Sequence, residues 1–400
     1  LSQLRAAVQI AAARLRPARV TDLRVDEGAT GLTVTGRIDN LNFVARIPAR
    51  WNRQSVLFAH GYVTPGQPET VSADRDPAGG LGTLVNAQGY AYAYSAYAKA
   101  GYAVQSGVQA TQNLKRFLDL VGSTRAYATG ASMGGNIVMA LVEKYPDDYV
   151  GGMPFCGVTG GWGEEIRYLT DFRVVYDFFT RGTPYALPGA DNILAPTAAF
   201  TQQLLQQRLT ALFTDAAASQ DAAVKANARN IVGRVAAATG ANPDPTSFVT
   251  ALAGFGYGLQ DYLVTTGGNG YGNVGKVYRT LGDATDAALN EGVLRVTADP
   301  RASAYLTQWY RPTGQFRAKV LSFHNVVDPL VPFQHAAILK DTVTRAGNAA
   351  NLVQQTVAAN TAAPRHCDFT PGQVTFAWNE LRAWVDGGAR PQDGLDITAK

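Results

Sequence analysis

The sequence predicts an α/β fold built on a mainly parallel, doubly wound sheet. Short apolar segments typical of buried strands recur along the chain, and segments with helical periodicity separate them. Strands that alternate with helices favour parallel pairing, because each parallel pair needs a crossover connection. The chain has 400 residues, of which 46% are hydrophobic and 16% are charged. This composition provides a sizeable core and excludes both a small disulfide scaffold and a disordered protein.

The N-terminal part predicts a helix followed by a hairpin. Residues 2–15 have a helical composition. Residues 30–51 alternate between apolar and polar side chains, as an antiparallel hairpin does when one face is buried. We interpret residues 1–50 as a lead-in to the larger sheet.

Six further strands are predicted after this hairpin. They lie at residues 55–61, 89–97, 125–129, 149–157, 319–325 and 351–359. Residues 136–145 have a helical pattern directly after the third of these strands. Residues 371–388 predict a terminal amphipathic helix that ends at glycine.

A segment of different character separates the fourth of these strands from the fifth. Residues 200–213, 221–238 and 246–263 have helical patterns, with a break at 242–245. The glycine-rich stretch 267–273 follows no predicted strand and opens no helix, which argues against a phosphate-binding loop. We therefore assign residues 1–162 and 316–400 to one core, and residues 163–315 to a mostly helical insertion that acts as a lid.

Charge and the rarer residue types exclude several classes of protein. The 35 Lys and Arg residues and 31 Asp and Glu residues give a net charge of +4 without a basic patch, so we expect no nucleic-acid partner. Two cysteines do not make a zinc site by themselves, and we expect neither a metal nor an organic cofactor. The sequence contains no run of about eighteen consecutive apolar residues, so it predicts no membrane span. The chain begins at Leu1, and we expect a mature secreted or periplasmic form whose leader has been removed.

The segment Gly130-Ala131-Ser132-Met133-Gly134 matches the pattern G-x-S-x-G. In this pattern a strained turn between a strand and a helix exposes a serine hydroxyl, and the flanking glycines avoid clashes. Here a predicted strand precedes the segment and a predicted helix follows it. This context makes Ser132 the candidate nucleophile.

A serine nucleophile needs a base, and the base needs an acid that orients it. With this type of turn the chain order is serine, acid, histidine. Asp328 follows the predicted strand 319–325 in an Asp-Pro turn, so it is the candidate acid, and a purely turn-capping role is the alternative. Asp368 and Asp386 come after the candidate base and fit this order poorly.

Four histidines compete for the role of base. His366 lies in a loop after the last predicted strand, where this chain order requires it. His324 lies in the strand that presents Asp328, and His335 lies in the following helical segment. We expect both to be structural or surface residues, and we assign the base to His366.

A tetrahedral intermediate needs two N–H donors for its oxyanion. The amide of Met133, directly after the serine, supplies the first. We assign the second to the amide of Tyr62, where the strand that begins at residue 55 runs into His60-Gly61-Tyr62. Gly61 allows the turn there, and His60 shapes the loop.

Aromatic residues predict an apolar substrate pocket beside this turn. Tyr97 ends the tyrosine-rich strand 89–97 and is placed near the mouth together with Tyr62. With Trp162, Phe255 and Tyr257 they favour a pocket that accepts aromatic or apolar groups, and His60 and Gly61 are assigned to the same pocket. The alternative for these tyrosines is packing in the core.

The elbow, the acid, the base and the oxyanion turn together resemble the α/β-hydrolase superfamily, over most of the chain outside residues 163–315. The segments 89–108, 297–306, 310–314, 326–335 and 365–369 are similar to a group of secreted bacterial members described mainly as esterases. This resemblance implies hydrolysis of small-molecule carboxylic esters by Ser132, Asp328 and His366 under a large lid.

The pair His366-Cys367 also resembles the tannase and feruloyl esterase family, in which a cysteine before the serine bonds to one after the histidine. In this sequence Ala131 precedes the serine, and the other cysteine is Cys156. A disulfide between Cys156 and Cys367 would fix the histidine loop to the sheet. Two buried free thiols are the alternative.

Two other functions use the same residues or the same fold. A serine peptidase or amidase has the same triad, because the triad does not define the leaving group. A binding module without catalytic activity is the third hypothesis.

Overall fold

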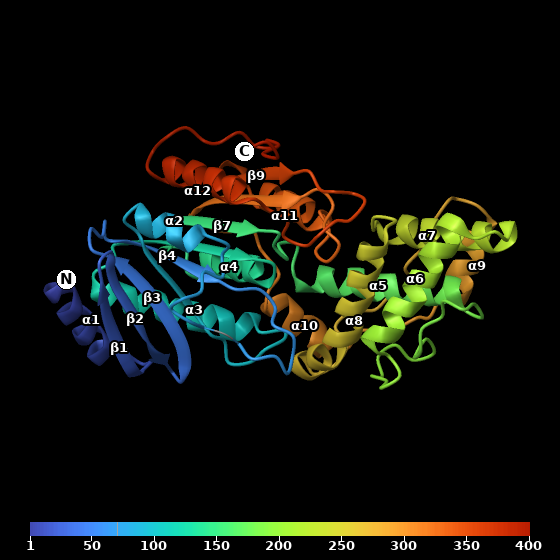
Figure 1. The fold of residues 1–400 in the computed structure, drawn as a ribbon, viewed down its shortest axis with the longest axis horizontal. Coiled ribbons are helices and arrows are strands. Elements are labelled where there is room, and N and C mark those ends of the chain that lie inside the picture. The colour runs from blue at the N-terminus through green and yellow to red at the C-terminus, as the bar shows by residue number, and fades with distance from the viewer. Residues whose placement is uncertain (70) are drawn as a thin grey trace.

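The computed structural model describes residues 1–69 and 71–400 of the chain. In this part nine strands form one sheet, helices cover both of its faces, and further helices extend to one side (Figure 1). The strands are β1 (Val20–Gly28), β2 (Gly31–Ile38), β3 (Leu41–Pro48), β4 (Gln54–Ala59), β5 (Ala91–Ser95), β6 (Arg125–Ala131), β7 (Gly151–Phe155), β8 (Lys319–Asn325) and β9 (Leu352–Val357).

The helices of the described part lie before, between and after these strands. They are α1 (Ser2–Arg14), α2 (Leu81–Ala87), α3 (Val104–Val121), α4 (Met133–Lys144), α5 (Trp162–Thr180), α6 (Gln202–Ala218), α7 (Ala222–Thr239), α8 (Pro245–Thr266), α9 (Ala284–Gly292), α10 (Pro300–Gln308), α11 (Gln334–Arg345) and α12 (Pro371–Val385), with the short 3₁₀ helix η1 (Ala349–Asn351).

The strand order of the sheet is β1-β2-β3-β5-β4-β6-β7-β8-β9. β1, β2 and β3 form an antiparallel meander, and β3 pairs with β5 in the same sense. All neighbouring strands from β5 to β9 are parallel. The prediction of a mainly parallel sheet with an N-terminal hairpin is therefore confirmed. Because the carboxyl ends of parallel strands share one edge, the loops after β4, β6, β7, β8 and β9 meet there.

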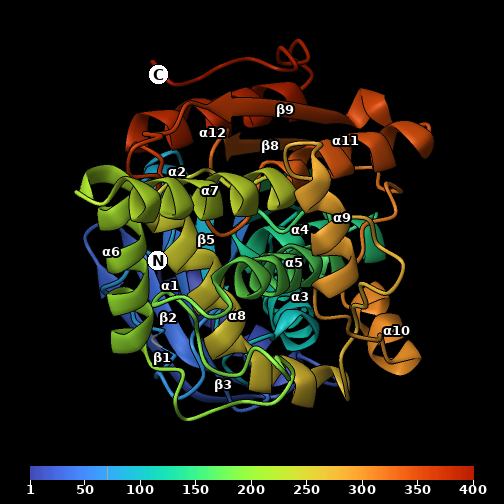
Figure 2. The same cartoon turned by 90° about the vertical axis from the view of Figure 1, so that its right-hand side faces the viewer.

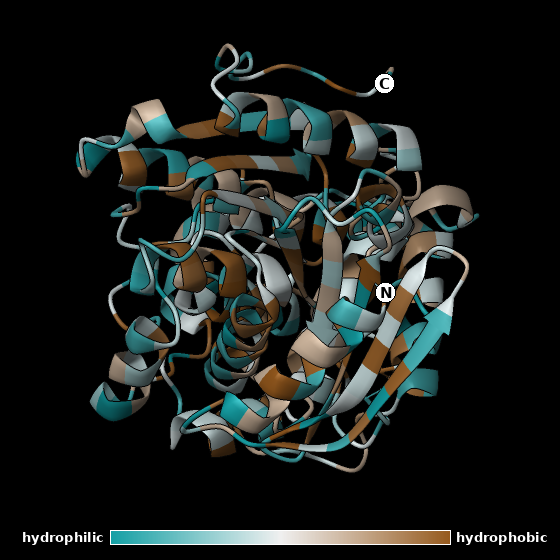
Figure 3. Cartoon of the chain, turned by 90° about the vertical axis from the view of Figure 1, so that its left-hand side faces the viewer, coloured by the Kyte–Doolittle hydropathy of each residue, from teal (hydrophilic) through white to brown (hydrophobic). Residues whose placement is uncertain are grey.

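The edge strand β1 was not predicted from the sequence. Its residues alternate between exposed and half-buried positions, and it includes the charged residues Asp22, Arg24, Asp26 and Glu27. Charges are typical of an edge strand, because they prevent pairing with another chain, but they also hide the apolar alternation. Figure 3 shows hydrophobic and hydrophilic bands alternating along the strands beside the N-terminus.

The two faces of the sheet have separate hydrophobic cores. Helices α1, α3 and α4 cover one face, and α2 and α12 cover the other. Consecutive residues of β4 divide between them, with Leu57 in the first core and Val56 in the second. Tyr90, Tyr92 and Tyr94 all belong to the second core. Tyr92 and Tyr94 of β5, and Tyr90 just before it, are therefore packing residues on the face that α2 and α12 cover.

Between β7 and β8 the chain forms helices α5 to α10. Helices α5, α6, α7 and α8 pack against one another, and Figure 2 shows them facing the viewer. The predicted break at 242–245 is the turn between α7 and α8, where the Asp244 side chain accepts a hydrogen bond from the Ser247 amide. Within the described residues, no helix combines the length and the apolar character that crossing a bilayer requires.

The glycine-rich stretch predicted at 267–273 lies between α8 and α9. The hydroxyl groups of Tyr271 and Tyr278 donate hydrogen bonds of 2.8 and 2.6 Å to Oδ1 of Asp171, which is buried on α5. The Asn273 side chain donates to the Leu294 carbonyl at 2.9 Å. These bonds tie the stretch to α5 and to the segment before α10.

Candidate active site

The serine of the G-x-S-x-G pattern lies on a tight turn between β6 and α4. Ser132 has a φ of 58°, which is rare for a residue with a side chain. A Cβ on Gly134 would lie 1.9 Å from the Ala59 carbonyl oxygen, and a Cβ on Gly130 would lie 2.5 Å from the Gly134 carbonyl oxygen. Only glycine fits these two positions, so the glycines of the pattern allow β4, β6 and α4 to approach closely enough to form the turn.

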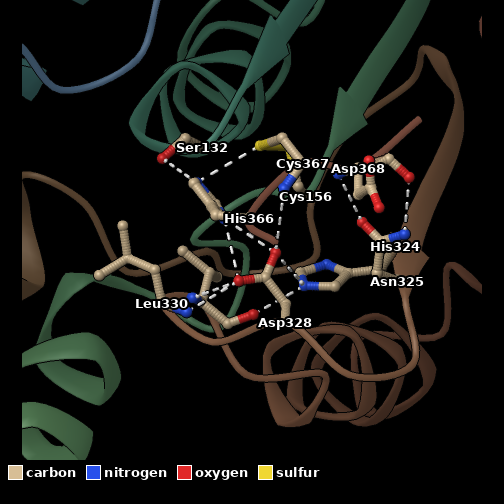
Figure 4. The surroundings of a disulfide bond; sticks show 10 residues. Ser132, Cys156, His324, Asn325, Asp328, Leu330, His366, Cys367 and Asp368 are labelled. Atoms are coloured by element: carbon tan, nitrogen blue, oxygen red, sulfur yellow. Dashed lines mark hydrogen bonds and ion pairs between the residues drawn. A yellow bond between two sulfur atoms is a disulfide. The ribbon is translucent and has the colours of Figure 1, made fainter. Parts of the chain in front are cut away.

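The structure brings His366 and Asp328 to Ser132 (Figure 4). Asp328 follows β8, and His366 lies in the loop between β9 and α12. The His366 Nε2 atom is 2.9 Å from the Ser132 Oγ atom. On the other side of the ring, Nδ1 is 2.8 Å from Oδ2 of Asp328. The three groups form one hydrogen-bonded chain, although they come from three separate loops.

The surroundings of Asp328 keep it ionised and orient it. Burial alone would raise the pKa of this carboxyl group, but the nearby His366 and His324 and the bond from the Val331 amide lower it below its usual value. Its Oδ1 atom accepts the amides of Leu330 and Val331 at 2.9 Å each. An ionised carboxylate only accepts hydrogen bonds, so His366 holds its proton on Nδ1. Its Nε2 atom is then free to accept the hydroxyl proton of Ser132.

His324 and His335, the two histidines that were expected to be structural or surface residues, are both buried. Nε2 of His324 is 2.8 Å from the Val331 carbonyl oxygen. His335 Nδ1 accepts the Gly160 amide at 3.0 Å, and its Nε2 faces Oε2 of Glu165 at 3.1 Å. Burial lowers the pKa of each ring to about 4. Both rings are therefore neutral near pH 7 and structural in character, and neither lies at the surface.

The buried neutral state of His324 predicts a specific loss of stability in acid. In the unfolded chain a histidine titrates near pH 6.5, whereas burial holds the pKa of His324 at about 4 in the fold. Between these pH values only the unfolded state binds the proton, so the free energy of unfolding falls as the pH drops. The fall is roughly 1.4 kcal/mol per pH unit for this one group, and the contribution vanishes above about pH 6.5.

A comparison of wild type with His324→Gln isolates this effect, because all other titrating groups are shared. Urea unfolding at several pH values should show wild type losing stability relative to the variant by roughly 1.4 kcal/mol per unit between about pH 6.5 and pH 4, and no relative change above that range. Parallel stability curves for the two proteins would contradict the assignment of His324 as a buried neutral ring.

The two amides expected at the oxyanion are close to the serine turn. Met133 is the first residue of α4, and Tyr62 lies in the loop after β4. A Cβ on Gly61 would lie 3.3 Å from the Ser132 Cβ, which places this loop against the nucleophile. Among the described residues, neither amide donates to a protein acceptor. The assignment of these two amides to the oxyanion stays a prediction.

A second layer of contacts supports this loop. The His60 ring stacks on Tyr97 with 3.7 Å between ring centroids. Tyr97 donates its hydroxyl to the His60 carbonyl at 3.1 Å, and Glu69 pairs with the His60 ring and accepts the Tyr97 amide. The side chains of His60 and Tyr97 thus fix the position of the backbone at Gly61 and Tyr62.

Cys156 and Cys367 form a disulfide bond across 211 residues. Cys156 directly follows β7, and Cys367 directly follows His366. In the pairing of β6 with β7, Ala131 faces Phe155, the residue before Cys156. Cys156 therefore follows β7, which pairs with β6, the strand that leads into the turn at Ser132. Since the two sulfurs are bonded to each other, they are not thiolates that bind a metal beside His366.

An apolar cavity of about 120 Å³ lies beside Ser132. Most of its wall comes from α5, α8 and the segment after Asp328, and it includes Ile166, Leu169, Phe255, Leu259, Leu330 and Val331. Of the residues predicted for the pocket, Tyr62, Trp162 and Phe255 line it. The described lining residues do not include His60, Gly61 or Tyr97. Tyr257 is 40% exposed and contacts Phe200 instead.

Two acidic residues of this cavity were missed at the level of sequence. Glu165 lines it, as does Asp261 on α8, and Tyr102 lies in the same wall. Asp261 accepts the Tyr102 amide at 2.7 Å and pairs with Lys99, which connects α8 to the loop after β5. The spacing of Glu165, Ile166 and Leu169 indicates one face of a helix, but no local pattern reveals what that face meets.

Comparisons with known proteins agree with this architecture. No family model and no curated protein sequence matches the chain. Among solved structures, feruloyl esterase B from Aspergillus oryzae is similar with a TM-score of 0.55 and 13% identity, covering 97% of this chain and 91% of that chain. An esterase from Aspergillus oryzae has a TM-score of 0.53 and 14% identity, with 94% and 88% covered. Tannin acyl hydrolase from Aspergillus niger has a TM-score of 0.50 and 12% identity, with 96% and 87% covered. The chain therefore has the α/β-hydrolase fold and resembles the structures of tannase and feruloyl esterases.

Proposed function

We propose that the protein is a serine hydrolase that cleaves carboxylic esters through an acyl-enzyme intermediate. The observation that carries this proposal is the hydrogen-bonded chain from Asp328 through His366 to Ser132, which ends at the wall of an apolar cavity. A packed, buried carboxylate, a correctly protonated imidazole and a strained serine are the parts that nucleophilic acyl transfer needs.

In this mechanism the Ser132 oxygen attacks the ester carbonyl carbon while His366 Nε2 takes the hydroxyl proton. Asp328 stabilises the resulting imidazolium, and the amides of Tyr62 and Met133 donate to the oxyanion. His366 then returns the proton to the alcohol as the C–O bond breaks. Water, activated by the same ring, hydrolyses the acyl group from Ser132.

Two observations favour esters over peptides as substrates. The cavity beside Ser132 is small and apolar, whereas a peptide substrate also presents backbone N–H and C=O groups that need partners. The solved structures described above are a feruloyl esterase, an esterase and a tannin acyl hydrolase. The serine peptidase, the amidase and the binding module remain the alternatives for the test below.

We further propose that residues 163–315 act as a lid and that the protein works outside the cytoplasm. Helices α5 and α8 of this segment supply the larger part of the cavity wall, so the segment governs which acyl or alcohol groups enter. Disulfides persist in oxidising compartments, and the Cys156–Cys367 bond supports a secreted or periplasmic location.

A fluorophosphonate probe tests the proposed function directly. We expect stoichiometric labelling of wild type at Ser132 and none of Ser132→Ala, because the probe reacts only with an activated serine. Short p-nitrophenyl esters should be cleaved by wild type, whereas aminoacyl p-nitroanilides should not. Failure of wild type both to react with the probe and to cleave any ester would favour the binding module, and preferential anilide cleavage would favour the peptidase.

A further inference from the structure

The backbone that carries the Tyr62 amide is held on both sides by the loop between β5 and α3, the β5–α3 loop. At one side the Tyr97 hydroxyl donates to the His60 carbonyl at 3.1 Å. At the other side the Gly101 amide donates to the Val63 carbonyl at 2.7 Å. The Tyr62 amide lies between these two carbonyl groups in the chain, so its position depends on where the β5–α3 loop lies.

Asp261 on α8 holds the β5–α3 loop in turn. Its Oδ2 atom accepts the Tyr102 amide at 2.7 Å, and its Oδ1 atom pairs with the Lys99 Nζ atom at 2.5 Å. Gly101 has a φ of 81°, and a Cβ at this position would lie 2.1 Å from Oδ2 of Asp261. The carboxylate of Asp261 therefore lies directly against the backbone of the loop, at a position that only glycine fits.

The same face of α8 also meets the Tyr62 side chain. A Cβ on Gly258 would lie 3.5 Å from the Tyr62 hydroxyl oxygen. Gly258 and Asp261 are three residues apart, so they share one side of the helix. Burial and the charge of Asp261 raise the pKa of Tyr62, as expected for a carboxylate near its ring. Helix α8 thus contacts the Tyr62 side chain and also the loop that holds its backbone.

The charge of Asp261 has no part in the proton transfers of the proposed reaction. The hydrogen-bonded chain at Ser132 uses Asp328 as its acid. The Asp261 side chain is only 14% exposed, and taking a carboxylate out of water is costly unless it is paired. Within the described part of the chain, its hydrogen bond and its ion pair both reach the β5–α3 loop. These contacts indicate that Asp261 serves to hold this loop.

We propose that Asp261 is a positioning residue: it fixes the β5–α3 loop against α8, and through this loop it places the Tyr62 amide for the oxyanion. This inference rests on the proposed ester hydrolysis at Ser132, in which the Tyr62 amide is one of two donors. Such a donor acts mainly when negative charge develops on the substrate oxygen, so its position affects turnover more than substrate binding. Helix α8 thereby contributes to the chemical step as well as to the cavity wall.

Three variants separate the hydrogen bond of Asp261 from its charge. Asp261→Ala removes the acceptor for the Tyr102 amide. Asp261→Asn keeps a carbonyl oxygen for this amide, and Lys99→Met removes the ion pair but leaves the carboxylate. With p-nitrophenyl acetate we expect kcat/KM to fall by about 10- to 100-fold in Asp261→Ala, and by less than about threefold in the other two.

A matched pair of inhibitors distinguishes a displaced oxyanion donor from a loss of folded protein. 2,2,2-Trifluoroacetophenone forms a reversible adduct: the Ser132 oxygen bonds to the carbonyl carbon, the hydroxyl proton passes to His366, and the carbonyl oxygen becomes the oxyanion. 2,2,2-Trifluoro-1-phenylethanol has the same frame and forms no such adduct. In Asp261→Ala we expect the inhibition constant of the ketone to rise by about the factor that kcat/KM loses, and that of the alcohol to change by less than about threefold. Neither constant depends on how much of the protein is folded.

Gly101→Ala provides a second route to the same displacement if Asp261→Ala does not fold. It keeps Asp261 but places a Cβ against the carboxylate, so the loop has to shift. The ketone should again bind more weakly, and the alcohol should not. Gly240→Ala on α7 is the matched control, because Gly240 has a similar φ of 77° and no described atom within 4 Å of an added Cβ. It should leave the inhibition constants of both compounds unchanged.

The outcomes separate this inference from the proposed function. Weaker binding of the ketone alone in Asp261→Ala, with near wild-type binding in Asp261→Asn and Lys99→Met, supports the inference. It is overturned by unchanged ketone binding in Asp261→Ala or Gly101→Ala, by an equal loss for the alcohol, or by an equal loss in Asp261→Asn or Lys99→Met. The proposed function survives each of these results as long as wild type reacts with the fluorophosphonate probe and cleaves p-nitrophenyl acetate. Wild type that does neither and is not inhibited by the ketone overturns both proposals.

Discussion

Asp328→Asn is expected to lower kcat for ester hydrolysis by about 10⁴-fold, with little change in KM. Oδ1 of Asp328 accepts the amides of Leu330 and Val331, so the carbonyl oxygen of an asparagine would take that position. The amide NH₂ group would then face Nδ1 of His366 and donate to it. The ring proton would move to Nε2, which would point at Ser132 as a donor and no longer accept the hydroxyl proton.

Steady-state kinetics with p-nitrophenyl esters measure this effect. Asp368→Asn is the matched control and should keep wild-type kcat, because within the described part of the chain the Asp368 side chain pairs only with the exposed Arg365. Thermal unfolding of both variants shows whether the fold is intact. A fall of less than about tenfold in a folded Asp328→Asn protein would mean that this carboxylate does not set the tautomer of His366.

Removal of the disulfide is expected to reduce both stability and turnover. The bond closes a loop across 211 residues, and the chain-entropy model gives about 5 kcal/mol for such a loop, at the top of the usual range of about 2–5 kcal/mol. Cys367 also adjoins His366, whose ring must stay within hydrogen-bond distance of Ser132. A displacement of about 1 Å there reduces turnover by about 100-fold. We therefore expect both the free energy of unfolding and kcat to be lower in Cys156→Ala/Cys367→Ala than in wild type.

The two single variants provide the control for this experiment. Either substitution alone breaks the bond, so each single variant and the double variant should show nearly the same loss, in contrast to independent sites, whose effects add. Guanidinium unfolding and p-nitrophenyl ester kinetics measure the two effects. A double variant that is less stable but keeps wild-type kcat would show that the bond holds the fold without positioning His366.

Much of the site was predictable because its chemistry depends on local patterns and chain order. The glycines around Ser132 are required because a Cβ at Gly134 or Gly130 would lie only 1.9 or 2.5 Å from a backbone carbonyl oxygen, so the elbow leaves a local signature in the sequence. Asp328 and His366 follow the strands that became β8 and β9, and parallel strands bring their carboxyl ends together. The order of the motif along the chain was thus sufficient to nominate residues that lie in three separate loops.

The cavity was much less predictable, because its wall comes from segments far apart in the sequence. Glu165 acquires its character from His335, which lies 170 residues later in the chain. Tyr97 is an aromatic residue of the kind that often lines an apolar pocket, yet its ring stacks on His60 behind the expected oxyanion loop. The strand β1 was missed because its charged side chains, which suit the edge of a sheet, hide the apolar alternation by which a strand is predicted.

The position of the disulfide also affects how the protein responds to proteolysis. Helices α5 to α11 and strands β8 and β9 all lie between Cys156 and Cys367. A protease that cuts one exposed loop in this interval produces two polypeptides, but each of them carries one of the bonded cysteines. The nicked protein therefore stays one covalent molecule with Ser132 on one piece and His366 on the other, and the two pieces separate only under reducing conditions.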